Sequence, residues 1–162
     1  MSGSMGFGNV TELVRHLLNS HADEVEVLLI CGNNTTLQAT LQKEFGMHNN
    51  ITILGFTDKI SLLMDACDIL FTKPGGLSST EAAAKNIPII HTAPIPGCET
   101  RNAEFFHYHG MSYSSKDIDE QIRQAMRLCT DLPYRNKMIF SQKININTEV
   151  CSHILKLCTT NN

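Results

Sequence analysis

The stretch FTKPGGLSSTEAAA, residues 71–84, decides the fold, because an apolar run ends in Pro-Gly-Gly and passes directly into a sequence of helical character. Gly75 and Gly76 have no side chain, so the main chain there can approach a ligand closely. The first amides of the following helix lack partners within it and lie at the positive end of its dipole. Ser78 adds a hydroxyl donor and Lys73 a positive charge. The stretch therefore predicts a strand-to-helix turn that binds a phosphate-like anion.

A second interpretation of the same stretch needs no ligand. Gly75 and Gly76 would only form a turn, while Ser78 and Glu81 would form a capping box at the start of the helix. On these residues alone the two interpretations are equally good. The position in the fold favours the first, because ligands of open α/β sheets bind outside the carboxyl ends of the strands.

Short apolar runs alternate with stretches of helical period along the rest of the chain, as in βα units around a parallel sheet. The runs predict strands at 25–30, 51–54, 68–72 and 87–91, with a weaker one at 111–113. Helical patterns follow at 10–18, 37–45, 60–67 and 118–129, and Pro133 opens a last segment whose residues 144–148 are poor helix formers. We expect a single α/β domain over 1–162, with helices on both faces of its sheet.

The amino-terminal residues form a glycine-rich loop, 2–9, that runs straight into a helix capped by Asn9. The strand that should precede such a loop is missing, so we expect 1–4 to be the remnant of that strand, and the chain to be a portion of a longer protein. An NAD site is disfavoured, because the next strand ends in Cys31-Gly32-Asn33 and not in an acidic residue.

Two further turns follow strands at the same predicted edge. The loop 91–102 is stiffened by two prolines and turns at Gly97, and it places Glu99 and Asn102 where they could bind sugar hydroxyls. The alternative for it is a rigid surface loop with no ligand. The turn 55–58 ends in Asp58, which we expect either to contribute to a site or only to cap the next helix.

The composition excludes several functions. The chain is 42% hydrophobic and 18% charged with a net charge of -3, as in an ordinary globular protein, and its 16 acidic residues outnumber 13 basic ones, which disfavours nucleic acid as a partner. No C-x-x-C pair and no cysteine–histidine pair at ligand spacing is present, so we expect no metal and reduced thiols. The thiols are those of Cys31, Cys67, Cys98, Cys129, Cys151 and Cys158.

The combined pattern of these turns resembles a known family. The runs 53–58, 63–68, 72–76, 79–82 and 94–99, together with Asn102, are similar to the C-terminal domain of the diacylglycerol glycosyltransferases. These include the monogalactosyldiacylglycerol synthases and the processive diacylglycerol glucosyltransferases, and they are related to the N-acetylglucosaminyltransferase of peptidoglycan precursors. The resemblance spans nearly all of 2–110.

The resemblance implies a Rossmann-like domain that forms the C-terminal half of a GT-B glycosyltransferase and binds a UDP-sugar. The reaction it implies is inverting and metal-independent, needs no cofactor, and transfers a hexose to diacylglycerol or a related lipid. No catalytic residue is expected in this chain, because the general base and the acceptor site would belong to a separate N-terminal domain. The residues implied to bind the UDP-sugar are Ser4, Met5, Gly6, Phe56, Thr57, Lys73, Gly75, Gly76, Leu77, Ser78, Glu81, Gly97, Glu99 and Asn102.

One position departs from the family pattern. Cys98 stands where family members have glutamine before Glu99, and a thiol is a poor partner for a sugar hydroxyl. The identity of the donor sugar is therefore open. Among the histidines, His91 is the one expected near the cleft, at a strand end.

Three rival functions stay open at this point. The first is a stand-alone donor-binding subunit that pairs with a membrane-bound partner. The second is a UDP-sugar epimerase of the same two-domain fold, which would need extra acids and histidines in the cleft. The third is a flavodoxin-like module that binds no nucleotide. For the glycosyltransferase we expect a cytoplasmic, peripherally membrane-associated protein.

Overall fold

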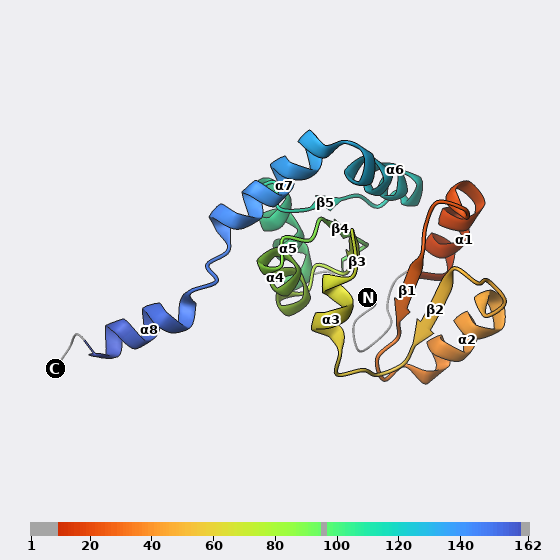
Figure 1. Ribbon diagram of the computed structural model, residues 1–162, viewed down its shortest axis with the longest axis horizontal. Helices are drawn as coiled ribbons and strands as arrows, with labels where there is room; N and C mark the ends of the chain where they lie inside the picture. The colour runs from red at the N-terminus through yellow and green to blue at the C-terminus, as the bar shows by residue number, and fades with distance from the viewer. Residues whose placement is uncertain (1–9, 95–96, 160–162) are drawn as a thin grey trace.

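Helices and strands alternate along the chain in the computed structural model, which describes residues 10–94 and 97–159. The strands are β1 (Val27–Ile30), β2 (Ile51–Leu54), β3 (Leu70–Thr72), β4 (Ile89–His91) and β5 (Tyr113–Ser114). The helices are α1 (Val10–His21), α2 (Thr35–Phe45), α3 (Ile60–Asp65), α4 (Gly76–Ala84), α5 (Cys98–Tyr108), α6 (Ile118–Thr130), α7 (Leu132–Asn145) and α8 (Val150–Thr159) (Figure 1). Every strand pairing between them is parallel, which confirms the Rossmann-like α/β class expected for the C-terminal half of a GT-B enzyme.

Helices cover both faces of the sheet that holds β3, β4 and β5. Neighbouring residues of β4 point to opposite faces, and Ile89 and Ile90 accordingly belong to different core clusters. Ile89 packs with residues of α3, α4 and α5, including Phe106. Ile90 packs with α6 and α7 through Leu128 and Met138. The alternation in one strand therefore organises two helical layers, as the sequence predicted.

Among residues 10–94 and 97–159 the strands fall into two pieces. β1 pairs with β2, and β3, β4 and β5 form a second sheet. α1 and α2 cover one face of the first piece, where Val14 and Leu41 pack against Leu29. In residues 10–94 and 97–159 no strand joins β1 to β3. The predicted strand remnant at 1–4 and the cap Asn9 lie outside the described residues.

The predicted break in the last helical segment is confirmed. α7 ends at Asn145 and α8 begins only at Val150, so the poor helix formers between them separate two helices. None of the side chains of α8 is buried, and Figure 1 shows this helix projecting away from the remainder of the chain. Within the described ranges no helix combines the length and the apolar character that a membrane crossing requires.

Gln142 ties α7 to the end of the sheet. Its side chain is fully buried, and its Nε2 donates to the carbonyl of Ile87 at 2.9 Å and to that of Met111 at 3.0 Å. These carbonyls precede β4 and β5, where a buried acceptor without a donor would be costly. The buried side-chain amide of Gln142 thus connects α7 to the residues that precede β4 and β5.

Candidate functional site

The loop between β3 and α4 has the geometry of an anion-binding turn. Gly75 is the N-cap of α4 and no side chain caps the helix. The N–H of Ser79 reaches the carbonyl of Gly75 at 3.2 Å, which leaves the N–H groups of Gly76, Leu77 and Ser78 without an acceptor in the described part of the chain. Three amides at the positive end of a helix dipole are therefore free to bind an anion.

This geometry corrects the alternative interpretation of the same stretch. The capping box would need Ser78 at the N-cap and Glu81 three residues later, but the helix begins at Gly76 and its N-cap is Gly75. Ser78 and Glu81 both lie inside the helix. The capping-box interpretation is wrong, because the helix starts three residues earlier than it requires.

Open space lies above the two glycines. Among the described residues, a Cβ added at Gly75 would have no atom within 4 Å, and one added at Gly76 would meet only Nδ2 of Asn102, at 3.9 Å. Gly75 has φ -73° and ψ 144°, an extended conformation that any residue adopts. Neither the backbone nor the packing therefore requires glycine at position 75, and the missing side chain leaves room for a ligand at the helix start.

The first turns of α5 meet this loop. Gly97 is the N-cap of α5 with φ 110°, a left-handed conformation that favours glycine. Nδ2 of Asn102 donates to the carbonyl of Pro74 at 3.0 Å, which joins α5 to the loop. Burial lowers the pKa of the Lys73 ammonium, and the negative charge of Glu99 opposes that shift. The structure thus brings Lys73, Glu99 and Asn102 together around the start of α4.

The turn between β2 and α3 carries an exposed aromatic side chain and a threonine hydroxyl that accepts a hydrogen bond. The side chain of Phe56 is 75% exposed, and Oγ1 of Thr57 accepts from the N–H of Lys59 at 3.1 Å. The N-cap of α3 is Lys59, with no side-chain cap, so the suggestion that Asp58 caps this helix is wrong: the threonine hydroxyl closes the turn instead. No hydrogen bond or ion pair among the described residues joins Phe56 or Thr57 to the loop at Gly75.

The other residues predicted to bind the UDP-sugar lie either on α4 or outside the described residues. Leu77 is 82% exposed at the start of α4, and Glu81 is exposed on the same helix, one turn further along. Ser4, Met5 and Gly6 lie outside the described residues. Across 10–94 and 97–159, no group of three histidine, cysteine, aspartate or glutamate side chains is arranged to hold a metal ion.

His91 is part of a buried network that sequence reasoning did not foresee. Its ring is fully buried at the end of β4, with Nε2 2.9 Å from Oγ of Ser79 and Nδ1 3.0 Å from Oγ of Ser112. Phe106 contacts the ring edge-on at a centroid distance of 5.5 Å. Since Ser79 lies in the first turns of α4, the network connects α4 to the sheet. The ring of His91 is buried and is not exposed to solvent beside the loop at Gly75.

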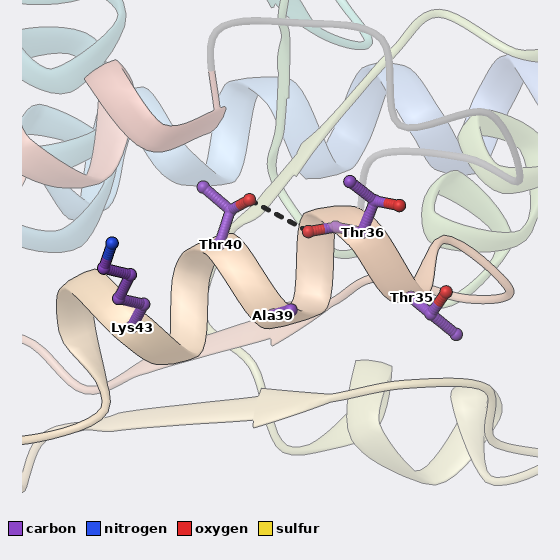
Figure 2. A pocket seen from close by; sticks show the side chains of 5 residues that line it. All are labelled: Thr35, Thr36, Ala39, Thr40 and Lys43. Atoms are coloured by element: carbon purple, nitrogen blue, oxygen red, sulfur yellow. Dashed lines mark hydrogen bonds between the residues drawn. The ribbon is translucent and has the colours of Figure 1, made fainter.

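A shallow depression on α2 carries no comparable chemistry. Its volume is about 480 Å³, and Figure 2 shows its lining side chains along one face of a single helix. Oγ1 of Thr40 donates to the carbonyl of Thr36 at 2.9 Å, a bond internal to the helix. In the part of the chain that the structure describes, no second element brings a polar group to it, so we assign it no function.

One protein family matches most of the chain. Its description is "Glycosyl transferases group 1", and the match covers residues 6–143. The matched region includes the loop at Gly75, the start of α5 and the network of His91.

Curated relatives match almost the whole chain but extend well beyond it. Processive diacylglycerol beta-glucosyltransferase of Staphylococcus carnosus (strain TM300) is 29% identical over 160 residues, which are 96% of this chain and 41% of that protein. The protein of the same name from Bacillus pumilus (strain SAFR-032) is 38% identical over 133 residues, 81% of this chain and 34% of that protein. The chain therefore spans less than half the length of these relatives.

Solved structures share the fold. The UDP co-structure of Staphylococcus aureus MnaA aligns with a TM-score of 0.70 at 16% identity, over 91% of this chain and 39% of that one. MurG of Acinetobacter baumannii aligns with a TM-score of 0.69 at 17% identity, over 99% and 48%. Anabaena HepE in complex with UDP-glucose aligns with a TM-score of 0.61 at 16% identity, over 92% and 44%. At these identities the likeness shows the fold alone.

Proposed function

Because the chain belongs to the glycosyl transferases group 1 family, we propose that it binds the UDP-sugar donor of an enzyme that transfers a hexose to diacylglycerol or a related lipid. The observation that carries the proposal is the uncapped start of α4, where the amides of Gly76, Leu77 and Ser78 have no acceptor in the described residues. The names of the curated relatives support the lipid acceptor, and the UDP and UDP-glucose complexes of proteins with this fold support the donor.

The proposed mechanism is electrostatic stabilisation of the leaving group. As the bond between sugar and UDP breaks, negative charge develops on the β-phosphate. Fixed amides and a helix dipole stabilise that charge without reorganising during the reaction, and the ammonium of Lys73 lies next to the loop. We propose that the reaction is independent of metal, because these groups can supply the stabilisation that a cation would otherwise supply. We also propose that it is inverting, as the resemblance to the diacylglycerol glycosyltransferases implies.

The acceptor side of the reaction is proposed to belong to polypeptide outside this sequence. The relatives are more than twice as long as the region they share with this chain, which leaves room for an acceptor domain. We propose that this domain supplies the general base and the contact with a membrane surface, in a cytoplasmic protein that associates with the membrane peripherally. Phe56 and Thr57 are proposed to hold the uracil ring at the edge of the site.

The direct test is calorimetric titration of the chain with UDP, UDP-glucose and UDP-galactose, in the presence of EDTA and with NAD as control. We expect saturable binding of the UDP compounds and none of NAD. Binding that disappears with EDTA would contradict the metal-independent proposal. A folded sample that binds none of the three UDP compounds would contradict the donor site itself.

Glu81→Ala should weaken UDP binding about tenfold. We propose that the exposed carboxylate of Glu81 accepts hydrogen bonds from the ribose hydroxyls, and a hydrogen bond to a charged group contributes about 1.5 kcal/mol at the lower end of its range. Calorimetry with UDP and 2′-deoxy-UDP measures the effect: the unmodified chain should prefer UDP, and the variant should not.

Thr80→Ala is the matched control for this variant, because Thr80 is an exposed neighbour on the same helix. It should bind both nucleotides as the unmodified chain does. An equal preference for UDP in Glu81→Ala and in the unmodified chain would remove Glu81 from the ribose site.

Cys98→Gln should raise the affinity for UDP-glucose about fivefold without changing that for UDP. Cys98 is exposed at the start of α5, where a glutamine amide could hydrogen-bond a sugar hydroxyl that the thiol cannot, for a gain of about 1 kcal/mol. Titrations with the two ligands measure the difference. Cys151→Gln, an equally exposed change on α8, should alter neither affinity, and a gain for UDP alone in Cys98→Gln would contradict a contact with the sugar.

A further inference from the structure

Three successive main-chain carbonyls of the loop between β3 and α4 accept hydrogen bonds. The carbonyl of Lys73 accepts from the N–H of Gly75 at 2.7 Å, which is the bonding pattern of a γ-turn centred on Pro74. The carbonyl of Pro74 accepts from Nδ2 of Asn102 at 3.0 Å. The carbonyl of Gly75 accepts from the N–H of Ser79 at 3.2 Å. The first and third bonds are local to the turn, whereas the second comes from another helix, α5.

The carbonyl of Pro74 needs a donor from within the protein, because Pro74 is fully buried and an unpaired buried carbonyl is costly. Among residues 10–94 and 97–159, Asn102 provides this donor. A carbonyl only accepts, so the nitrogen of the Asn102 amide faces the loop. A peptide group is planar, so a rotation that turned the carbonyl of Pro74 toward water would also turn the N–H of Gly75 away from Lys73.

The helix that carries Asn102 is held more firmly than the loop. Ala103 and Phe106 of α5 are buried, and Phe106 packs in the core with Ile89. Asn102 directly precedes Ala103, so its amide has a fixed place beside the loop. The two glycines of the loop have no side chains to pack, and a glycine main chain adopts many conformations. A donor on a packed helix therefore restricts a loop that its own residues hold only weakly.

On the basis of the donor site proposed above, we propose that Asn102 is a positioning residue for the diphosphate. Its amide holds the peptide between Pro74 and Gly75, and thereby keeps the loop in the conformation that presents the amides at the start of α4. This role differs from the contact with the UDP-sugar that the family resemblance implied. A loop that is in its binding conformation only a tenth of the time binds each of its ligands about tenfold more weakly. Loss of the Asn102 amide should therefore affect UDP and UDP-glucose alike.

Asn102→Ala tests this role by calorimetry with the two nucleotides. Its dissociation constants for UDP and for UDP-glucose should both rise about tenfold, whereas loss of a contact with the sugar would weaken binding of UDP-glucose alone. The matched control is Asn50→Ala. Nδ2 of Asn50 donates to the carbonyls of Ala22 and Val25, at 2.8 and 3.0 Å, so this variant loses the same kind of bond at the start of β2. It should bind both nucleotides as the unmodified chain does.

Amide exchange followed by NMR tests the positioning in the unliganded chain. The N–H of Gly75 should exchange about tenfold faster in Asn102→Ala than in the unmodified chain, and Asn50→Ala should not change it. Asn102→Asp should give the same acceleration, because a carboxylate has the shape of the amide but donates no hydrogen bond.

The outcomes separate this role from the donor site itself. An unmodified chain that binds neither nucleotide would contradict the donor site and, with it, the role of Asn102. Where the unmodified chain binds both, the role of Asn102 alone would be overturned by any of three results in the variants. These are a loss confined to UDP-glucose or absent in Asn102→Ala, an equal loss in Asn50→Ala, and unchanged exchange at Gly75.

Discussion

Gly75→Val is expected to weaken UDP binding about a hundredfold and to leave the melting temperature unchanged. The backbone at Gly75 is extended, a conformation that valine adopts readily, and an added Cβ would meet no atom of residues 10–94 or 97–159 within 4 Å. The added methyl groups would fill the space above the amides of Gly76 and Leu77. Loss of two hydrogen bonds to a charged phosphate costs about 3 kcal/mol, which is about a hundredfold in the dissociation constant.

Calorimetry with UDP and a thermal melt measure the two parts of this expectation. The matched control is Ala39→Val, which adds the same bulk to an exposed position in the depression on α2. It should bind UDP normally. If Gly75→Val binds UDP as the unmodified chain does, the phosphates do not lie at the start of α4, and if Ala39→Val loses binding instead, the depression on α2 is the nucleotide site.

Local patterns in the sequence were sufficient to predict most helices and strands of the fold. The strand at Ile51–Leu54 has the predicted bounds, and the break after Asn145 follows from residues that disfavour a helix. The weak strand was displaced: it lies at Tyr113–Ser114, because Met111 and Ser112 are buried before pairing with β4 begins.

The part of the candidate site that a single turn forms could be predicted from the sequence. The contacts between residues distant in sequence could not. The free amides after Gly75 follow from the local sequence Pro-Gly-Gly, which places glycine at the helix start. The bond from Asn102 to Pro74 joins residues 28 positions apart, and no periodicity reports such a contact. The same holds for the bonds from Ser79 and Ser112 to His91, since serine and histidine are most often found near the surface.

The free energy of unfolding should fall by about 3 kcal/mol between pH 6.5 and pH 4 because of His91 alone. Burial lowers the pKa of His91 from 6.5 to about 4. Its ring contacts two serine hydroxyls and Phe106, none of which stabilises a positive charge as a carboxylate would. The native state therefore keeps a neutral imidazole, and each unit of pKa difference is worth about 1.4 kcal/mol.

The direction of the effect follows from which state binds the proton. Above pH 6.5 the ring is neutral in both states, so the stability is fully present. As the pH falls through 6.5 the unfolded chain takes up a proton that the native state excludes, and stability is lost until the pH reaches about 4, where the native ring also protonates. Chemical denaturation at several pH values measures the free energy of unfolding. Between pH 6.5 and about 4 its dependence on pH should correspond to one proton bound by the unfolded chain and not by the native state.

His91→Gln isolates the contribution of this ring to the pH dependence of stability. Glutamine can hydrogen-bond serine hydroxyls but does not titrate, so the variant should be less stable at pH 7 and yet lose about 3 kcal/mol less on acidification. An acid slope as steep in His91→Gln as in the unmodified chain would mean that the buried ring is not the group that excludes the proton.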